Sequence, residues 1–119
     1  MRDHTKLRAF ELADELVLLT YRATGTFPSH EQFGLTNQMR RAAVSVASNI
    51  VEGCARASEA DYLRFLDMAY GSSREVAYQV TIAVRLGYLN DEIYQELERK
   101  AVETSKVLNG LIRSLRNRR

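Results

Sequence analysis

The sequence predicts an all-α protein, an up-and-down antiparallel four-helix bundle formed as one domain by residues 1–119. Three observations support this prediction. The chain has only one proline and six glycines in 119 residues, so breaks in helical structure are few. Four long stretches repeat apolar residues at helical spacing. The segments between them are short, and short connections place successive helices antiparallel to each other.

The first predicted helix covers residues 5–24 and ends at Gly25. Its apolar residues, which include Leu12 and Leu19, span about 200° of the helix surface, whereas a surface helix of a bundle needs about 100–140°. Two explanations are open. The helix has neighbours from its own chain on both sides, or a second subunit covers the excess.

The second predicted helix, residues 35–53, has two apolar strips, and Thr36 is its predicted N-cap. One strip can face the bundle core. The other strip consists of Val44, Ala47 and Val51, so this helix is predicted to contact more than its own bundle. We therefore expect an oligomer interface with Leu12 and Leu19 of the first helix as further members.

Polar residues run between these two strips, and Glu75 of the third helix is expected to face them. The seam includes Arg41, Ser45, Asn49 and Glu52. One interpretation is a contact with nucleic acid or a partner. The interpretation we favour is a hydrogen-bond network that orients helices or subunits. Within it, Glu52 has the spacing to pair with Arg56 four residues later, and Arg41 can pair with Glu75.

The third helix is predicted to begin at Ser58 and the fourth at Asn90, because both residues cap helix N-termini well. Gly87 is a C-terminal stop signal for the third helix. Gly71 lies in the middle of that helix, where glycine costs about 1 kcal/mol relative to alanine. We expect it to let the backbone of the second helix come close.

Three cations of the fourth helix, Arg99, Lys106 and Arg113, are seven residues apart and share one face. With Arg116 and Arg40 they are the candidate contacts to nucleic acid, since each cation can neutralise a phosphate. The alternative is an ordinary solvated face, because glutamates lie nearby in the sequence.

Composition also restricts the possible partners, cofactors and location of the protein. The net charge of +2 permits a nucleic-acid partner without requiring one. Cys54 is the only cysteine, and neither His4 nor His30 has a partner at ligand spacing, so we expect no disulfide within the chain, no metal and no cofactor. The absence of an apolar run of about 18 residues predicts no membrane span. A reducing cytoplasm and no enzymatic activity are expected.

Four runs of the sequence are distinctive: TFPSHEQFGLTNQMRRAAVSVASNIVEG, RASEADYLRFLDMAYGSSREV, LGYL and LNGLIRSL. Together they resemble a bacterial family known as the four-helix bundle protein or 23S ribosomal RNA intervening-sequence protein family. The resemblance implies an antiparallel four-helix bundle that assembles into a homopentameric barrel. Some members are encoded inside intervening sequences of large-subunit ribosomal RNA genes. Distant relatives are accessory proteins of diversity-generating retroelements, whose basic barrel binds a reverse transcriptase and its RNA.

From the residues and the resemblance together we expect a non-enzymatic, oligomeric accessory or scaffold protein. Its expected partners are further copies of itself, together with RNA or DNA and a nucleic-acid-processing protein such as a reverse transcriptase or ribonucleoprotein. The alternative is a protein-interaction scaffold with no nucleic-acid role. The resemblance identifies the fold more closely than the partner.

Overall fold

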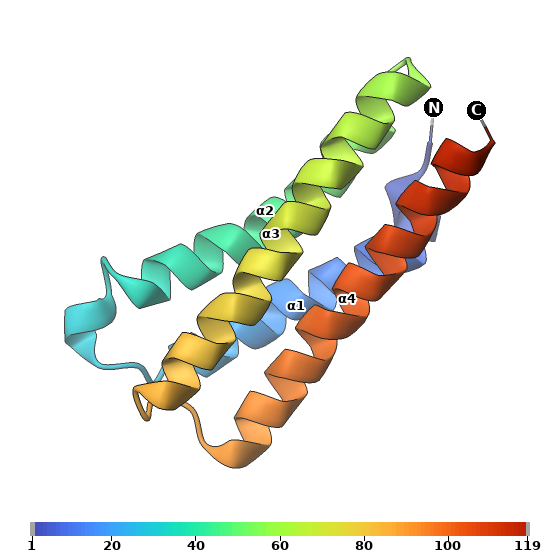
Figure 1. Ribbon diagram of the computed structural model, residues 1–119. Coiled ribbons are helices and arrows are strands. Elements are labelled where there is room, and N and C mark those ends of the chain that lie inside the picture. Colours follow the sequence, from blue (N-terminus) through green and yellow to red (C-terminus); the bar gives the residue numbers. More distant parts are fainter. Residues whose placement is uncertain (1, 119) are drawn as a thin grey trace.

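The computed structural model describes residues 2–118, and all regular elements within this range are helical (Figure 1). In chain order they are the 3-10 turn η1 (His4–Lys6), α1 (Arg8–Thr24), the 3-10 turn η2 (Ser29–Glu31), α2 (Leu35–Cys54), α3 (Glu59–Arg85) and α4 (Asp91–Asn117). Each α-helix packs against two others, α1 and α3 both lying between α2 and α4. The predicted four-helix bundle is therefore confirmed, whereas its assembly into a pentamer stays a prediction.

Side chains cap the starts of three elements, which are α3, α4 and the turn η1. Ser58 Oγ accepts the Asp61 N–H at 3.1 Å, and Asn90 Oδ1 accepts the Ile93 N–H at 2.8 Å, as the sequence predicts for α3 and α4. The α1 helix begins at Arg8 rather than at residue 5. The reason is that Asp3 caps the separate turn η1 and Leu7 then adopts extended backbone.

The N-cap prediction for α2 is wrong, because Thr36 lies inside the first turn of the helix and is buried. The N–H of Leu35 donates instead to Glu31 Oε1 at 3.0 Å. The other oxygen of Glu31 accepts the hydroxyl of Tyr88 at 2.8 Å. Glu31 therefore connects the start of α2 to the segment between α3 and α4.

At the end of α3, Gly87 has a φ of +79°, a backbone conformation that favours glycine.

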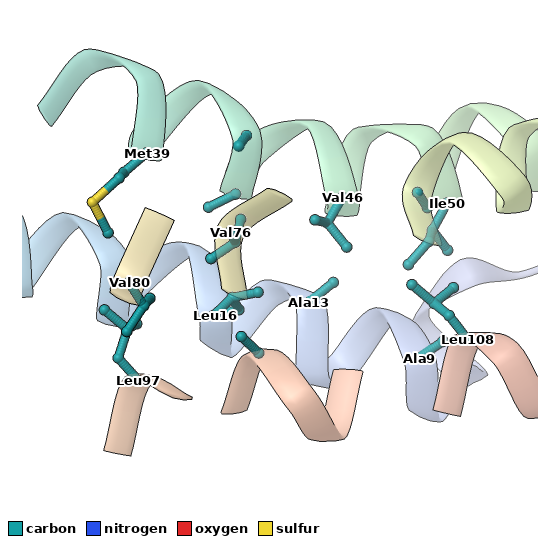
Figure 2. Close-up of a cluster of buried hydrophobic side chains, with 14 of the residues drawn as sticks. Ala9, Ala13, Leu16, Met39, Val46, Ile50, Val76, Val80, Leu97 and Leu108 are labelled. Atoms are coloured by element: carbon teal, nitrogen blue, oxygen red, sulfur yellow. The ribbon is translucent and has the colours of Figure 1, made fainter. Parts of the chain in front are cut away.

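Apolar side chains from all four helices fill the core (Figure 2). Figure 2 shows Leu16 of α1 among Val76 and Val80 of α3, and Ile50 of α2 near Leu108 of α4. Burying one such aliphatic side chain contributes about 1.5–3 kcal/mol.

Leu12 is also fully buried by its own chain, with 0% of its surface exposed. The prediction that Leu12 belongs to an oligomer interface is therefore wrong. It lies on the core side of the broad apolar arc of α1.

The two helices α2 and α3 come close together at Gly53, not at Gly71. A Cβ atom placed on Gly53 would lie 2.9 Å from the Cβ of Phe65 and 3.3 Å from Tyr62 Cδ1. A Cβ on Gly71 would meet no described atom of a neighbouring element within 4 Å. The expected close approach at Gly71 is therefore wrong, because this glycine faces open space.

Candidate functional site

The predicted cationic row of α4 is exposed along its whole length. Arg99, Lys106 and Arg113 are all exposed, and none forms an ion pair with another residue of the described range 2–118. Lys100, one residue along from Arg99, differs because its ammonium pairs with Glu15 of α1 and lies 3.8 Å from a Glu103 oxygen. Consequently Lys100 joins helices, whereas the row faces solvent.

The surroundings of this row carry both signs of charge. A shallow depression of about 410 Å³ is lined by Glu98, Arg99, Val102, Glu103 and Lys106. The carboxylate of Glu98 accepts the hydroxyl of Tyr94 in a short hydrogen bond, which raises the pKa of that tyrosine. The row on α4 therefore lies beside carboxylates as well as facing solvent.

The other two predicted nucleic-acid contacts have partners within the chain. Arg116 forms an ion pair with Asp67 of α3. Arg40 donates to Thr24 Oγ1 at 2.9 Å and to the carbonyl of Tyr21 at 3.3 Å, and its guanidinium carbon lies 4.5 Å from the centre of the Tyr21 ring. Arg40 therefore joins α2 to the end of α1. It does not belong to the row on α4, because α2 and α4 lie diagonally across the bundle.

The second apolar strip of α2 reaches the surface. Val44 is 38% exposed and Val51 36% exposed, with Ala47 half-buried between them. A shallow depression that Val44 lines also includes Tyr21 of α1, which is 44% exposed. Leu18, three residues before Tyr21, is 50% exposed. We refer to Leu18, Tyr21, Val44, Ala47 and Val51 as the α1–α2 apolar patch.

Leu19 does not belong to this patch. It lines a small, mostly apolar pocket of about 190 Å³ between α1 and α4, together with Ala23, Ile93 and Leu97. The sequence prediction included Leu19 and missed Leu18 and Tyr21. Tyr21 belongs to the broad apolar arc of α1, which indicates an excess of apolar surface without showing which residues remain exposed. Leu18 lies outside that arc, on the side of the helix that carries Glu11, Asp14 and Arg22.

Two members of the predicted polar network bond to each other and to α3. Ser45 Oγ lies 2.9 Å from Ser72 Oγ, and Asn49 Nδ2 donates to the carbonyl and the hydroxyl of Ser45 at 2.9 and 3.0 Å. A second serine pair, Ser73 and Ser105 at 2.7 Å, connects α3 with α4 inside the bundle. These bonds fix how the helices pack.

The charged members of that predicted network do not join it. Arg41, Glu52 and Glu75 are exposed, and among residues 2–118 none of them forms a hydrogen bond through its side chain or an ion pair. Arg41 and Glu75 line the same hollow, of about 280 Å³, between α2 and α3. The predicted pair of Glu52 with Arg56 is not formed, since α2 ends at Cys54 and the helical spacing is lost.

Phe33 was not predicted as a candidate and is the most exposed large apolar residue described, at 87%. It precedes Gly34 at the start of α2. An aromatic ring in this position is available to a partner.

Burial keeps the groups nearest to the core in their neutral forms. It raises the pKa of Tyr62 to about 12 and also raises the pKa of the Cys54 thiol. A thiol in this setting packs as a small apolar side chain rather than reacting as a thiolate. Within residues 2–118, no group of three or more histidine, cysteine, aspartate or glutamate residues is placed to hold a metal ion. Over the same range, no helix has the length and apolar character to cross a membrane.

Comparison with known proteins gives one family and one fold. A family model described as 23S rRNA-intervening sequence protein matches residues 5–110. A solved structure from Bacteroides thetaiotaomicron VPI-5482, a protein with unknown function from the S23 ribosomal protein family, matches with a TM-score of 0.80 and 22% identity. The match covers 88% of this chain and 95% of that one, and at this identity it shows the shared fold. No curated protein matches the chain.

Proposed function

The chain belongs to the 23S rRNA-intervening sequence protein family, and from this premise we propose that it is an oligomeric accessory or scaffold protein that binds RNA or an RNA-handling partner. The proposed partner is a nucleic-acid-processing protein such as a reverse transcriptase or a ribonucleoprotein. The observation that carries the RNA part is the row of Arg99, Lys106 and Arg113. These side chains lie on the exposed face of α4 without an ion pair among the described residues.

The spacing of the row suits an extended polyanion. Residues seven apart on a helix are separated by about 10 Å along its axis, so the three charges span about 21 Å. Each contact with a phosphate releases a condensed counterion, and binding through several such contacts weakens steeply as salt rises. In an oligomer the row would repeat once in each subunit.

The test is a triple charge reversal of the row, Arg99→Glu, Lys106→Glu and Arg113→Glu. The matched control reverses Arg22, Arg74 and Arg85, which are exposed arginines on α1 and α3. Binding to a structured RNA is measured by fluorescence anisotropy at roughly 50 and 200 mM salt. We expect the wild type to bind more weakly at the higher salt, the triple variant to lose at least about tenfold in affinity, and the control to change little.

Three results would contradict the RNA proposal. They are no binding near the micromolar range at low salt, an affinity that salt does not change, and an equal loss in the control variant.

We also propose that the protein assembles with itself through the α1–α2 apolar patch, into a pentamer according to the family resemblance. Val44→Asp and Val51→Asp place a charge in that contact, where burial without a partner is costly. Sedimentation velocity should show dissociation for both variants. The control is Ala60→Asp at the exposed start of α3, which should stay assembled. A fully assembled Val44→Asp variant would exclude this patch as the interface.

The second candidate function is a protein-interaction scaffold with no nucleic-acid role. The exposed ring of Phe33 and the α1–α2 apolar patch favour it, because such surfaces bind proteins. The triple reversal distinguishes the two functions. Only the RNA-binding protein loses RNA affinity while its assembly, measured by sedimentation, stays intact.

A non-enzymatic role and a cytoplasmic location complete the proposal. The neutral forms of Tyr62 and Cys54 support the first, since neither is activated as a nucleophile. The single cysteine supports the second, because it fits a reducing compartment.

A further inference from the structure

One end of the bundle brings together the N-terminal segment, the connection between α2 and α3, and the last turns of α4 (Figure 1). Arginines from all three segments lie at this end. Three arginines at this end have carboxylate partners: Arg64 with Asp61 at 3.7 Å, Arg116 with Asp67, and Arg118 with Glu59 at 3.0 Å. Arg113 belongs to the unpaired row on α4 described above. Arg2 and Arg56 differ, because neither forms an ion pair with any residue in the described range 2–118.

Arg2 and Arg56 line one cleft. Its volume is about 540 Å³, and Ala55 and Ala57 complete its lining. Arg2 Nη1 donates to the backbone carbonyl of Arg56 at 3.0 Å, so the N-terminal segment is attached to the α2–α3 connection at this point. We refer to this space as the Arg2–Arg56 cleft.

Aromatic rings hold both guanidinium groups in place. The Arg2 guanidinium carbon lies 4.1 Å from the centre of the Tyr62 ring, and that of Arg56 lies 4.8 Å from the centre of the Phe65 ring. An aromatic face stabilises a cation without neutralising it, and a stacked guanidinium keeps its in-plane N–H groups available. Little conformational entropy is then lost when an anion binds, because the side chains are already positioned.

The local charge balance favours an anionic ligand. Two cations that line the same cleft repel each other, and the small alanines beside them contribute no charge. Carboxylates near the two arginines in sequence have other partners among the described residues. Asp3 accepts the N–H and the hydroxyl of Thr5, Glu59 pairs with Arg118, and Asp61 lies 3.7 Å from Arg64. Glu52 does not pair with Arg56, because α2 has already ended.

Planar guanidinium groups with several N–H donors match the oxygens of a phosphate. We propose that the Arg2–Arg56 cleft binds a phosphate group, and that an RNA strand presents it. The identity of this carrier rests on the proposed RNA-binding function, whereas the phosphate site does not. The cleft is separate from the row on α4 and would give the protein a second, more localised contact with the same nucleic acid.

The experiment uses the full chain and three probes, which are inorganic phosphate and one RNA oligonucleotide with either a 5′-phosphate or a 5′-hydroxyl. Binding of inorganic phosphate is followed by backbone amide shifts in NMR spectra, and binding of each RNA by fluorescence anisotropy at constant ionic strength. The variants are Arg56→Ala and Arg56→Lys. Arg85→Ala is the matched control, because Arg85 is exposed and ends α3, whose start lies at the cleft. Thermal unfolding shows whether each variant is folded.

For the wild type we expect saturable shifts at residues 55–58 with inorganic phosphate. Arg56→Ala should weaken phosphate binding at least about tenfold, as expected when a charge-assisted hydrogen bond is lost. Arg56→Lys keeps the charge and tests the planar group, so it should recover only part of the affinity. Arg85→Ala should bind like the wild type.

The RNA probes identify the carrier. If the RNA with a 5′-phosphate binds more tightly than the RNA with a 5′-hydroxyl, and this preference depends on Arg56, the cleft binds the terminal phosphate of a strand. If both RNAs bind equally and through Arg56, the cleft binds a phosphodiester of the backbone. If inorganic phosphate binds through Arg56 and neither RNA binds, the site stands and the proposed RNA function fails. If no probe shows Arg56-dependent binding up to about 10 mM, the phosphate site itself is wrong.

Discussion

Replacing Gly53 with alanine should destabilise the bundle although alanine is the better helix former. The built Cβ atom would lie 2.9 Å from the Cβ of Phe65, where ordinary contacts begin near 3.4 Å. The Phe65 atom is at the base of its side chain, so a rotamer change cannot move it away. Relief requires α2 and α3 to separate by a few tenths of an ångström in a closely packed region.

The two opposing effects can be compared in magnitude. Alanine gains about 1 kcal/mol over glycine in a helix interior, and overpacking of this kind costs about 1–3 kcal/mol. Gly53→Ala should therefore lower the free energy of unfolding by about 0–2 kcal/mol. Gly71→Ala is the matched variant, because the same change in the middle of α3 meets open space. It should raise that free energy by up to about 1 kcal/mol.

The assay is urea unfolding of both variants and the wild type, followed by circular dichroism at several protein concentrations. We expect the two variants to differ by about 1–3 kcal/mol, with Gly71→Ala the more stable. Equal stabilisation by both substitutions would refute the steric argument and would mean that α2 and α3 are looser at Gly53 than the distances indicate. A lower stability of Gly71→Ala would show that this open face is covered in the assembled protein.

Two further predictions concern hydrogen bonds of the bundle. Ser105→Ala removes the buried bond to Ser73 and should lower the free energy of unfolding by about 1 kcal/mol, whereas Ser114→Ala, exposed on the same helix, should have little effect in the same urea assay. The N–H of Leu35 and the hydroxyl of Tyr88 hold the pKa of Glu31 below its ordinary value of 4.5. A lowered pKa stabilises the folded state at pH values above 4.5, and this contribution is lost as the pH falls through the folded-state pKa. The stability difference between wild type and Glu31→Gln should therefore shrink between about pH 6 and pH 3, and a constant difference would contradict the role of its charge.

Much of the fold could be predicted because helices depend on local sequence. The caps Ser58 and Asn90 and the stop at Gly87 act within a few residues, and the structure confirms all three. The prediction that Thr36 caps α2 is wrong because the carboxylate of Glu31, which belongs to the preceding turn η2, accepts the Leu35 N–H instead. The cationic row on α4 could be read from spacing alone, since residues seven apart share a helix face.

The sequence by itself determined which residues form helices, which side of each helix is apolar, and to which family the chain is similar. Only the tertiary structure decided which apolar and charged residues remain exposed. Leu12 and Tyr21 belong to one apolar arc of α1, yet the first is fully buried and the second is 44% exposed. Arg56 lies over Phe65 rather than beside Glu52, and it shares a cleft with Arg2, a residue 54 positions away. The physical reason is that a periodic pattern describes one helix, whereas exposure and charge pairing depend on the neighbours that other helices bring to it.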